Sequence, residues 1–297
     1  MTIAKTNLTT QELQEFSDVN ATALLMLYAR AMESCSEDPI LKDEQAERIV
    51  SQIDPLLAGS GDRFLSMLYN REIEPSLVVH AALRARKYDQ YALEFLSRHP
   101  DSVIANLGCG MDTRYQRIDD GEMTFFDLDL PAMVRFKRRV LQESERYRMI
   151  ADSVLETGWM EQVGEFVTGP ALFLVEGLLM YLEPHQVTSL VLKLQDRFPG
   201  SELVCEVANR RWIGGILGSL AASKMQRQLK LGKGAQFKSG LESPDEMEGW
   251  HAGIQYLEQW SYFDTRHPKL GWMRILGDIE PVRGVQYTVR YRLNPVA

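Results

Sequence analysis

The stretch Ser102-Val-Ile-Ala-Asn-Leu-Gly-Cys-Gly-Met-Asp-Thr-Arg114 decides the fold of this 297-residue chain. Its first part, from Val103 to Leu107, is apolar except for one asparagine, as expected for a buried strand of a parallel sheet. Two glycines spaced by one residue then permit a tight turn, at which backbone N–H groups approach a ligand closely. A helix that begins after such a turn points its positive end at that ligand. The stretch therefore predicts a binding site for a nucleotide-type ligand.

Composition and charge limit the classes of protein to which the chain can belong. Hydrophobic residues make up 45% of the sequence and charged residues 25%, which are values typical of globular domains. The net charge of −8 favours solubility and argues against a general nucleic-acid binder. The three cysteines, Cys35, Cys109 and Cys205, show no pairing pattern and are too scattered for a zinc site, so they suggest a reducing compartment.

The N-terminal residues are polar and carry no signal-peptide pattern, and no apolar run approaches membrane-spanning length. We therefore expect a cytoplasmic protein whose partners include neither nucleic acid nor a membrane.

Periodicity divides the chain into a helical region and an α/β region. Residues 1–101 are predicted to form helices packed on the core, among them helices at 19–32, at 44–53 before Pro55, and at 76–97. From 102 onward, strands alternate with helices, which predicts a doubly wound, mostly parallel sheet with helices on both faces. Strands are expected at 102–107, 123–128, 148–151, 171–176, 202–207, 254–263 and 285–293. Helices are expected at 112–118, 131–143, 155–163, 184–198 and 268–276.

Residues from about 209 to 250 interrupt this alternation and are rich in glycine, methionine and basic side chains. Their position after the fifth strand predicts a helical cap over the site. The basic side chains are interpreted either as a solvated surface or as a clamp for an anionic substrate: Arg210, Arg211, Lys224, Arg227, Lys230, Lys233 and Lys238.

Acidic residues at the strand ends narrow down the ligand. Thr113 stands where a dinucleotide-binding turn would carry its third glycine, which argues against a nicotinamide cofactor. Asp129 ends the second strand, where a carboxylate accepts hydrogen bonds from ribose hydroxyls. Asp152 follows the third strand and Glu176 ends the fourth, next to the position where open α/β sheets bind ligands. With a final strand that looks antiparallel, these features indicate a class I methyltransferase that uses S-adenosylmethionine (SAM).

Four motifs in order make a family resemblance specific. They are Leu107-Gly-Cys-Gly-Met-Asp-Thr-Arg-Tyr-Gln-Arg117, Phe126-Asp-Leu-Asp-Leu-Pro131, Ala151-Asp-Ser153 with Trp159, and Val175-Glu-Gly-Leu-Leu-Met-Tyr-Leu182. The chain resembles the leucine carboxyl methyltransferase superfamily, which includes polyketide O-methyltransferases of the tetracenomycin type. Segments 22–33 and 83–89 resemble the polyketide branch more than the protein phosphatase branch.

The resemblance implies a seven-stranded class I sheet with an N-terminal helical extension over 1–101. It also implies a SAM-binding domain over 102–297, with the cap inserted at about 209–250, and a role in secondary metabolism.

The resemblance also implies which residues contact SAM. The expected set is Arg84, Gly108, Cys109, Gly110, Asp129, Asp152, Ser153 and Glu176. Arg84 is implied to pair with the carboxylate of the methionine moiety, Gly108 to lie against that moiety, and Glu176 to lie near its amino group. Asp129 is implied to bind the ribose. Asp152 and Ser153 match the pair that contacts adenine, although relatives usually have leucine in place of Ser153.

Several of these residues have a plainer interpretation. Arg84 lies in a basic run that is also typical of a solvated helix face. Asp127 is equally well explained as the N-cap of the helix that starts at Pro131. Cys109 lies at a predicted helix start, where the pKa of a thiol is lowered, as in a nucleophilic cysteine. The plainer interpretation is that the turn needs a small residue at this position. No metal is expected, because no third oxygen-rich cluster accompanies the aspartates. The five histidines have no partner pattern: His185 is expected to cap or pack at a helix start, and His80, His99, His251 and His267 to lie on or near the surface.

The chemistry of methyl transfer indicates the acceptor. Transfer from a sulfonium is an in-line displacement that needs positioning above all. A carboxylate is ionised at pH 7 and needs no general base, whereas a phenol with a pKa near ~10 usually does. The scarcity of motif-linked histidines therefore favours methylation of a carboxylate on a small molecule, oriented by Arg210 or Arg211, with Tyr181 as a further candidate. A phenol or hydroxyl acceptor, an NAD-dependent dehydrogenase and a non-catalytic SAM-binding module are the alternatives.

Overall fold

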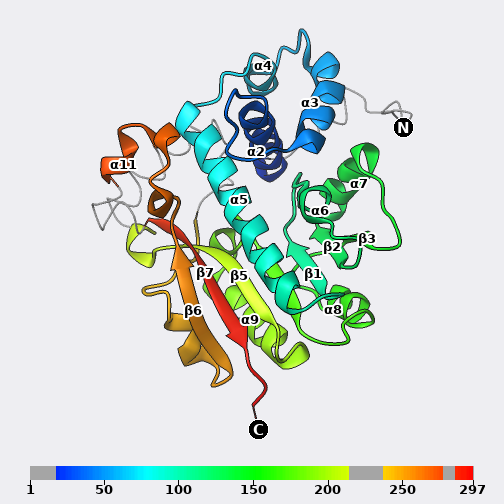
Figure 1. Ribbon diagram of the computed structural model, residues 1–297, viewed down its shortest axis with the longest axis vertical. Helices are drawn as coiled ribbons and strands as arrows, with labels where there is room; N and C mark the ends of the chain where they lie inside the picture. The colour runs from blue at the N-terminus through cyan, green and yellow to red at the C-terminus, as the bar shows by residue number, and fades with distance from the viewer. Residues whose placement is uncertain (1–17, 214–236, 277–284, 297) are drawn as a thin grey trace.

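The computed structural model in Figure 1 describes residues 18–213, 237–276 and 285–296. A seven-stranded sheet with the strand order β3-β2-β1-β4-β5-β7-β6 forms its centre. The first five strands run parallel, and β7 pairs antiparallel with both β5 and β6. The doubly wound, mostly parallel sheet predicted from the sequence is therefore confirmed. The strands are β1 (Val103–Leu107), β2 (Thr124–Asp129), β3 (Tyr147–Ala151), β4 (Ala171–Val175), β5 (Glu202–Ala208), β6 (Ile254–Trp260) and β7 (Gln286–Leu293).

Helices cover both faces of the sheet, so its central strands are buried. β1, β4 and β5 are buried along their whole length, which explains their near-continuous apolar sequence. Alternate residues of a strand point to opposite faces, and accordingly Ile104 packs in one core cluster while Ala105 packs in the other. In β7, Tyr287, Val289 and Tyr291 lie on one face of the strand and are buried in the core beside α9.

The helices follow the sequence pattern, with three differences. They are α2 (Asp18–Ser34), α3 (Glu44–Leu57), α4 (Arg63–Tyr69), α5 (Pro75–Arg98), α6 (Arg114–Ile118), α7 (Pro131–Val140), α8 (Gly158–Gly164), α9 (Pro184–Arg197) and α11 (Met273–Leu276). The long helix α5 runs diagonally across the sheet (Figure 1), with α2–α4 packed at its N-terminal end.

The differences have local physical causes. Helix α3 continues through Pro55 because it buries Ile53 and Leu57, and this burial offsets the backbone hydrogen bond that proline removes. The unexpected helix α4 begins where the Asp62 side chain accepts a hydrogen bond from Leu65 N. The helix expected at 268–276 is divided by Gly271, whose φ of 56° ends a short 3₁₀ turn before α11.

An ion-pair cluster lies at the N-terminal end of β5. The buried Glu202 carboxylate receives hydrogen bonds from Arg98 at 2.9 and 3.2 Å and from Arg290 at 2.7 and 2.9 Å. Burial alone would raise the pKa of Glu202, but these two guanidinium groups lower it to about 2. The cluster fastens α5 to the sheet at the end opposite the glycine turn.

None of the described helices is long and apolar enough to cross a membrane. Among the residues in the described ranges, no group of three or more His, Cys, Asp or Glu side chains is arranged to hold a metal ion.

Candidate active site

The glycine turn connects β1 to α6 at the carboxyl edge of the sheet, beside the point where β1 lies between β2 and β4. Gly108 and Gly110 adopt φ values of 69° and 48°, a region that side chains disfavour. The N–H groups of Gly108 and Cys109 donate to the carbonyl of Leu128 at 2.8 and 3.0 Å. Gly110 N donates to Asp129 Oδ2 at 2.7 Å. The turn is therefore locked to the end of β2.

Two aspartates predicted to bind the cofactor lie at the next two strand ends. Asp129 also accepts a hydrogen bond from Leu130 N at 2.7 Å, and burial raises the pKa of its carboxyl despite both backbone donors. Half-buried Asp152 follows β3 and accepts from Ser153 N at 2.8 Å, while Asp152 N donates to Asp129 O at 3.1 Å. The structure thus brings Gly110, Asp129 and Asp152 together along one edge of the sheet.

Arg84 and Glu176, which are 92 residues apart, form an ion pair above β4. Arg84 Nε donates to Glu176 Oε1 at 2.7 Å, and Arg84 Nη1 donates to both oxygens of Glu206 at 3.0 and 3.2 Å. Arg114 Nη2 donates to the second oxygen of Glu176 at 2.7 Å. The interpretation of Arg84 as part of a solvated helix face is therefore wrong, because its side chain is 12% exposed and paired with two carboxylates.

The pair belongs to a larger set of ion pairs, called here the arginine–carboxylate network. It continues from Arg114 to Asp89 and Asp112, and from these to Arg117. Opposite charges hold the pKa values of Asp112 and Glu176 below their usual range although burial alone would raise them. Its members are Arg30, Asp43, Arg84, Asp89, Asp112, Arg114, Arg117, Glu176 and Glu206.

Sequence reasoning missed most of this network. Arg114 and Arg117 belong to the quoted glycine motif, but the spacing indicates a helix and not which way its side chains point. Glu206 had a usable signal, because a glutamate in the interior of a strand that is buried along its whole length requires a buried partner.

Beneath the turn, Asp127 pairs with fully buried Lys137 at 2.7 Å and accepts a hydrogen bond from Tyr147 Oη at 2.6 Å. The N-cap interpretation of Asp127 is wrong, because its side chain points into the core and Leu130 occupies the cap position of α7. Burial also raises the pKa of the Cys109 thiol well above its usual value, which argues against a nucleophilic thiolate.

His80 lies one turn before Arg84 on α5 and is half-buried. Its ring packs against Tyr262, with ring centroids 4.4 Å apart. Burial, reinforced by the positive charge of Arg84, lowers the pKa of His80 to about 3. The imidazole is therefore neutral and weakly basic at physiological pH.

Residues 237–239, in the described part of the predicted cap, contact the turn that follows β4. This turn, η1 (Leu179–Tyr181), accepts hydrogen bonds at Met180 O from Lys238 N and at Leu179 O from Ser239 Oγ, both at 2.7 Å. The ring of Tyr181 meets Phe237 edge-on at 5.6 Å. Residues 214–236 of the cap, with Lys224, Arg227, Lys230 and Lys233, lie outside the described residues.

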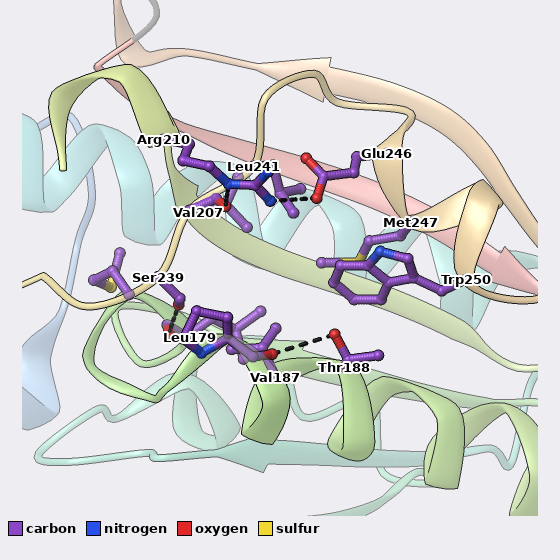
Figure 2. A pocket seen from close by; sticks show the side chains of 13 residues that line it. Leu179, Val187, Thr188, Val207, Arg210, Ser239, Leu241, Glu246, Met247 and Trp250 are labelled. Carbon is purple, nitrogen blue, oxygen red and sulfur yellow. Dashed lines mark hydrogen bonds and ion pairs between the residues drawn. The ribbon is translucent and has the colours of Figure 1, made fainter.

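A small pocket of about 90 Å³ opens between α9 and the segment 237–250 (Figure 2). Apolar side chains such as Val187, Met247 and Trp250 line it, and Arg210 borders it. Arg210 is paired with Glu242 at 3.0 Å and with Glu246, and Figure 2 shows the second pair at the rim. Small-molecule sites measure roughly 300–1,000 Å³, so this pocket is smaller than a typical ligand site.

Comparison with known proteins identifies the family. Residues 23–195 match the leucine carboxyl methyltransferase family. The chain belongs to this family. TcmP, a tetracenomycin polyketide synthesis O-methyltransferase of Streptomyces glaucescens, is 29% identical over 255 residues, which are 86% of this chain and 87% of TcmP. The SAM-dependent methyltransferase dpfgK of Gibberella zeae is 28% identical over 245 residues, 80% of each chain.

Among solved structures, a DUF574 family protein from Streptomyces avermitilis superimposes with a TM-score of 0.54 at 14% identity. The superposition covers 82% of this chain and 96% of that one, which shows the shared fold. This leucine carboxyl methyltransferase family member is an enzyme, a SAM-dependent methyltransferase, which excludes the dehydrogenase and the non-catalytic module.

The chemistry of the described side chains fits SAM. A guanidinium for the methionine carboxylate and a carboxylate for its amino group lie side by side at Arg84 and Glu176. Asp129 at the end of β2 and Asp152 after β3 carry carboxylates, which are the type of acceptor that ribose hydroxyls and an adenine amino group require. Because β4, β1, β2 and β3 are successive neighbours in the sheet, these groups follow one another along its edge in the same order as methionine, ribose and adenine in the cofactor.

Gly110 offers a local test of the turn. An added Cβ would lie 3.1 Å from Ala23 Cβ, and left-handed backbone costs a side chain roughly 1–2 kcal/mol. We expect Gly110→Ala to lower the free energy of unfolding by about 2 kcal/mol, measured by urea denaturation. It should also weaken binding of S-adenosylhomocysteine (SAH), measured by calorimetry, because Gly110 N holds Asp129.

The matched control is Gly121→Ala, whose φ of 88° is also left-handed but whose Cβ would meet nothing within 4 Å. Gly121→Ala should lower the free energy of unfolding through the backbone cost alone, and its affinity for SAH should be unchanged. Equal SAH affinity in the two variants would contradict the role given to the turn.

Proposed function

We propose that this enzyme transfers the methyl group of SAM to a carboxylate of a small-molecule acceptor and produces a methyl ester. The position of His80, packed against Tyr262 and one helical turn from the Arg84 guanidinium, carries the proposal. Of the five histidines, His80 is the one beside the arginine–carboxylate network, and its pKa of about 3 makes it a poor acceptor for a phenol proton. A carboxylate nucleophile is already ionised and needs no such base.

In the proposed site, Arg84 binds the carboxylate of the cofactor and Glu176 its amino group, with Gly108 and Cys109 beside the methionine moiety. Asp129 binds the ribose hydroxyls after Gly110 N has fixed its orientation. Asp152 and Ser153 contact the adenine. SAM supplies an electrophilic methyl on a sulfonium, and the task of this chain is to hold both reactants in line and to exclude water.

The acceptor is proposed to bind above η1, between the cofactor and the cap. Tyr181 is half-buried, and both Glu206 and Arg84 are near enough to affect its pKa, so this ring borders the network. Burial raises the pKa of Tyr181, which therefore stays protonated and donates a hydrogen bond to the acceptor carboxylate. Arg210 already holds two carboxylates, whereas exposed Arg211 lies at the same turn. Arg211 is thus the better candidate for orienting the acceptor.

A phenol or hydroxyl of a polyketide-like acceptor is the second candidate. The observation that favours it is the 29% identity to TcmP, an O-methyltransferase of tetracenomycin polyketide synthesis.

Methyl-tritiated SAM and a matched pair of acceptors, an aromatic carboxylic acid and the corresponding phenol, distinguish the two candidates. We expect the label on the acid, from which mild base should release it. The rate of methyl transfer should change little between about pH 6 and 9, because the carboxylate is ionised throughout. We also expect His80→Asn to retain kcat within about threefold, whereas loss of a general base typically costs about 100-fold or more. Base-stable label on the phenol, or a 100-fold loss in His80→Asn, would overturn the carboxylate proposal.

A further inference from the structure

The arginine–carboxylate network has unequal numbers of positive and negative groups. Ion pairs within 4.0 Å connect four guanidinium groups to five carboxylates among the described residues. The nearby pair of Lys137 with Asp127 is balanced and leaves this difference unchanged. With all groups ionised, the network carries a formal charge of −1 in a largely buried position.

The unbalanced carboxylate is Glu206. Glu176 accepts from two arginines, Arg84 and Arg114. Glu206 is 3% exposed and, among the residues that the structure describes, pairs with Arg84 alone. An isolated buried charge is costly unless a second positive charge approaches it or it takes up a proton.

Apart from Arg84 and Glu176, the groups around Glu206 in the described parts of the chain are uncharged. Tyr88 faces it from α5, Tyr181 from η1, and Gln286 and Thr288 from β7, while neighbouring Cys205 points to the other face of the sheet. The neutral ring of His80 lies one turn further along α5. Burial raises the pKa of Glu206, while the pKa of Glu176 is lowered. Glu206 is therefore the member of the network that gains a proton first.

The two forms of the cofactor differ by one charge. SAM carries an ammonium, a carboxylate and a sulfonium, for a net charge of +1. SAH has lost the sulfonium charge and is neutral. Beside the proposed position of the methionine moiety, a network with one surplus carboxylate is complementary to SAM and not to SAH, because charges in a partly desolvated site interact over several ångströms.

We propose that Glu206 is the residue by which this enzyme distinguishes SAM from SAH: its ionised carboxylate supplies the negative charge that matches the sulfonium. The proposal rests on the placement of the cofactor carboxylate at Arg84 given above. Ionised Glu206 favours SAM. After methyl transfer the sulfonium charge that it matched is gone, so Glu206, still paired with Arg84, takes up a proton from solvent and no longer favours the bound product. Glu206 does not touch the reacting atoms and acts through the charge of the site.

Calorimetric titration of SAM and SAH into wild-type protein and Glu206→Gln tests the proposal. We expect the preference for SAM, the ratio of the SAH to the SAM dissociation constant, to fall about tenfold in Glu206→Gln. In the wild type, we expect SAM affinity to increase relative to SAH affinity as pH rises from about 5 to 7, because deprotonated Glu206 is the form that favours SAM. SAM binding should release more protons than SAH binding, as measured in buffers of different ionisation enthalpy, and the substitution should abolish this difference.

Glu202→Gln is the matched control. Glu202 lies on the same strand, is equally buried and is paired with arginines, but at the opposite end of β5. Thermal unfolding checks that both variants are folded. The SAM-to-SAH preference should be unchanged in Glu202→Gln.

Three results would overturn the proposal. Equal weakening of both ligands in Glu206→Gln would show that Glu206 only orients Arg84. Equal tightening would show that it competes with the cofactor for Arg84. If Glu202→Gln changed the preference for SAM over SAH as much as Glu206→Gln, the effect would not depend on the position of Glu206 in the site. If wild-type protein bound neither ligand, the placement of the cofactor itself would fail, which is a different outcome from any of these.

Discussion

Replacing Arg114 by methionine is expected to lower the free energy of unfolding by about 3–5 kcal/mol, because it removes one partner from buried ion pairs. The Arg114 side chain is fully buried and contacts Asp89, Asp112 and Glu176 at 2.6–2.8 Å. Methionine fills part of the volume but leaves these carboxylates facing one another. Urea denaturation at pH 7.5 measures the loss.

The pH dependence of this loss has a definite sign. The network holds the folded-state pKa values of Asp112 and Glu176 below their usual range, so their ionisation stabilises the fold above their unfolded pKa values. This contribution is lost as pH falls through the folded values. The variant lacks the share of it that Arg114 supplies, while Arg84 and Arg117 keep theirs. The difference between wild type and variant should therefore shrink below about pH 4.

Arg48→Met is the control for this experiment. Arg48 pairs with Glu44 on the surface of α3, with both side chains 65% exposed, and its loss should cost less than about 1 kcal/mol. An effect of Arg114→Met no larger than that of Arg48→Met would contradict the structural role of the network.

Replacing Arg84 by methionine is expected to weaken SAH binding by about 100-fold or more. Loss of a charge-assisted hydrogen bond costs roughly 1.5–3 kcal/mol. In addition, Glu206 loses its partner, so the cofactor carboxylate would then meet an unpaired negative group. Calorimetric titration with SAH measures the affinity, and circular dichroism checks the fold.

Arg86→Met separates this effect from a general loss of charge on α5. Arg86 lies two residues further along the helix and makes a hydrogen bond of 3.5 Å to Ile40 O, away from the network. Its variant should bind SAH like the wild type. Comparable SAH affinities in both variants would contradict the assignment of Arg84 to the cofactor.

Local sequence determined much of the fold because the relevant signals act over short distances. The apolar run from Val103 to Leu107 and the glycine pair that follows fix a buried strand and a turn, since side chains disfavour the backbone angles at Gly108 and Gly110. The ends of elements were less predictable. Burial carried α3 past Pro55, and the glycine at position 271 divided the helix expected at 268–276.

The candidate site was predictable only in part, for the same reason. Asp129 and Asp152 follow strands directly, so their places at the carboxyl edge could be predicted from the strand pattern alone. The pairing of Arg84 with Glu176 and Glu206 spans 92 and 122 residues, and no local pattern encodes a contact over that separation.

By itself, the sequence determined the strand–turn–helix unit, the family and the row of acids along the sheet edge. Only the tertiary structure decided that Arg84 and Arg114 are buried among carboxylates and that Asp127 points inward to Lys137. It also decided that Glu206 gives the network one more carboxylate than it has arginines. Backbone preference and apolar periodicity act between near neighbours in the chain. The charge of a buried site depends on every group that folding brings within a few ångströms of it.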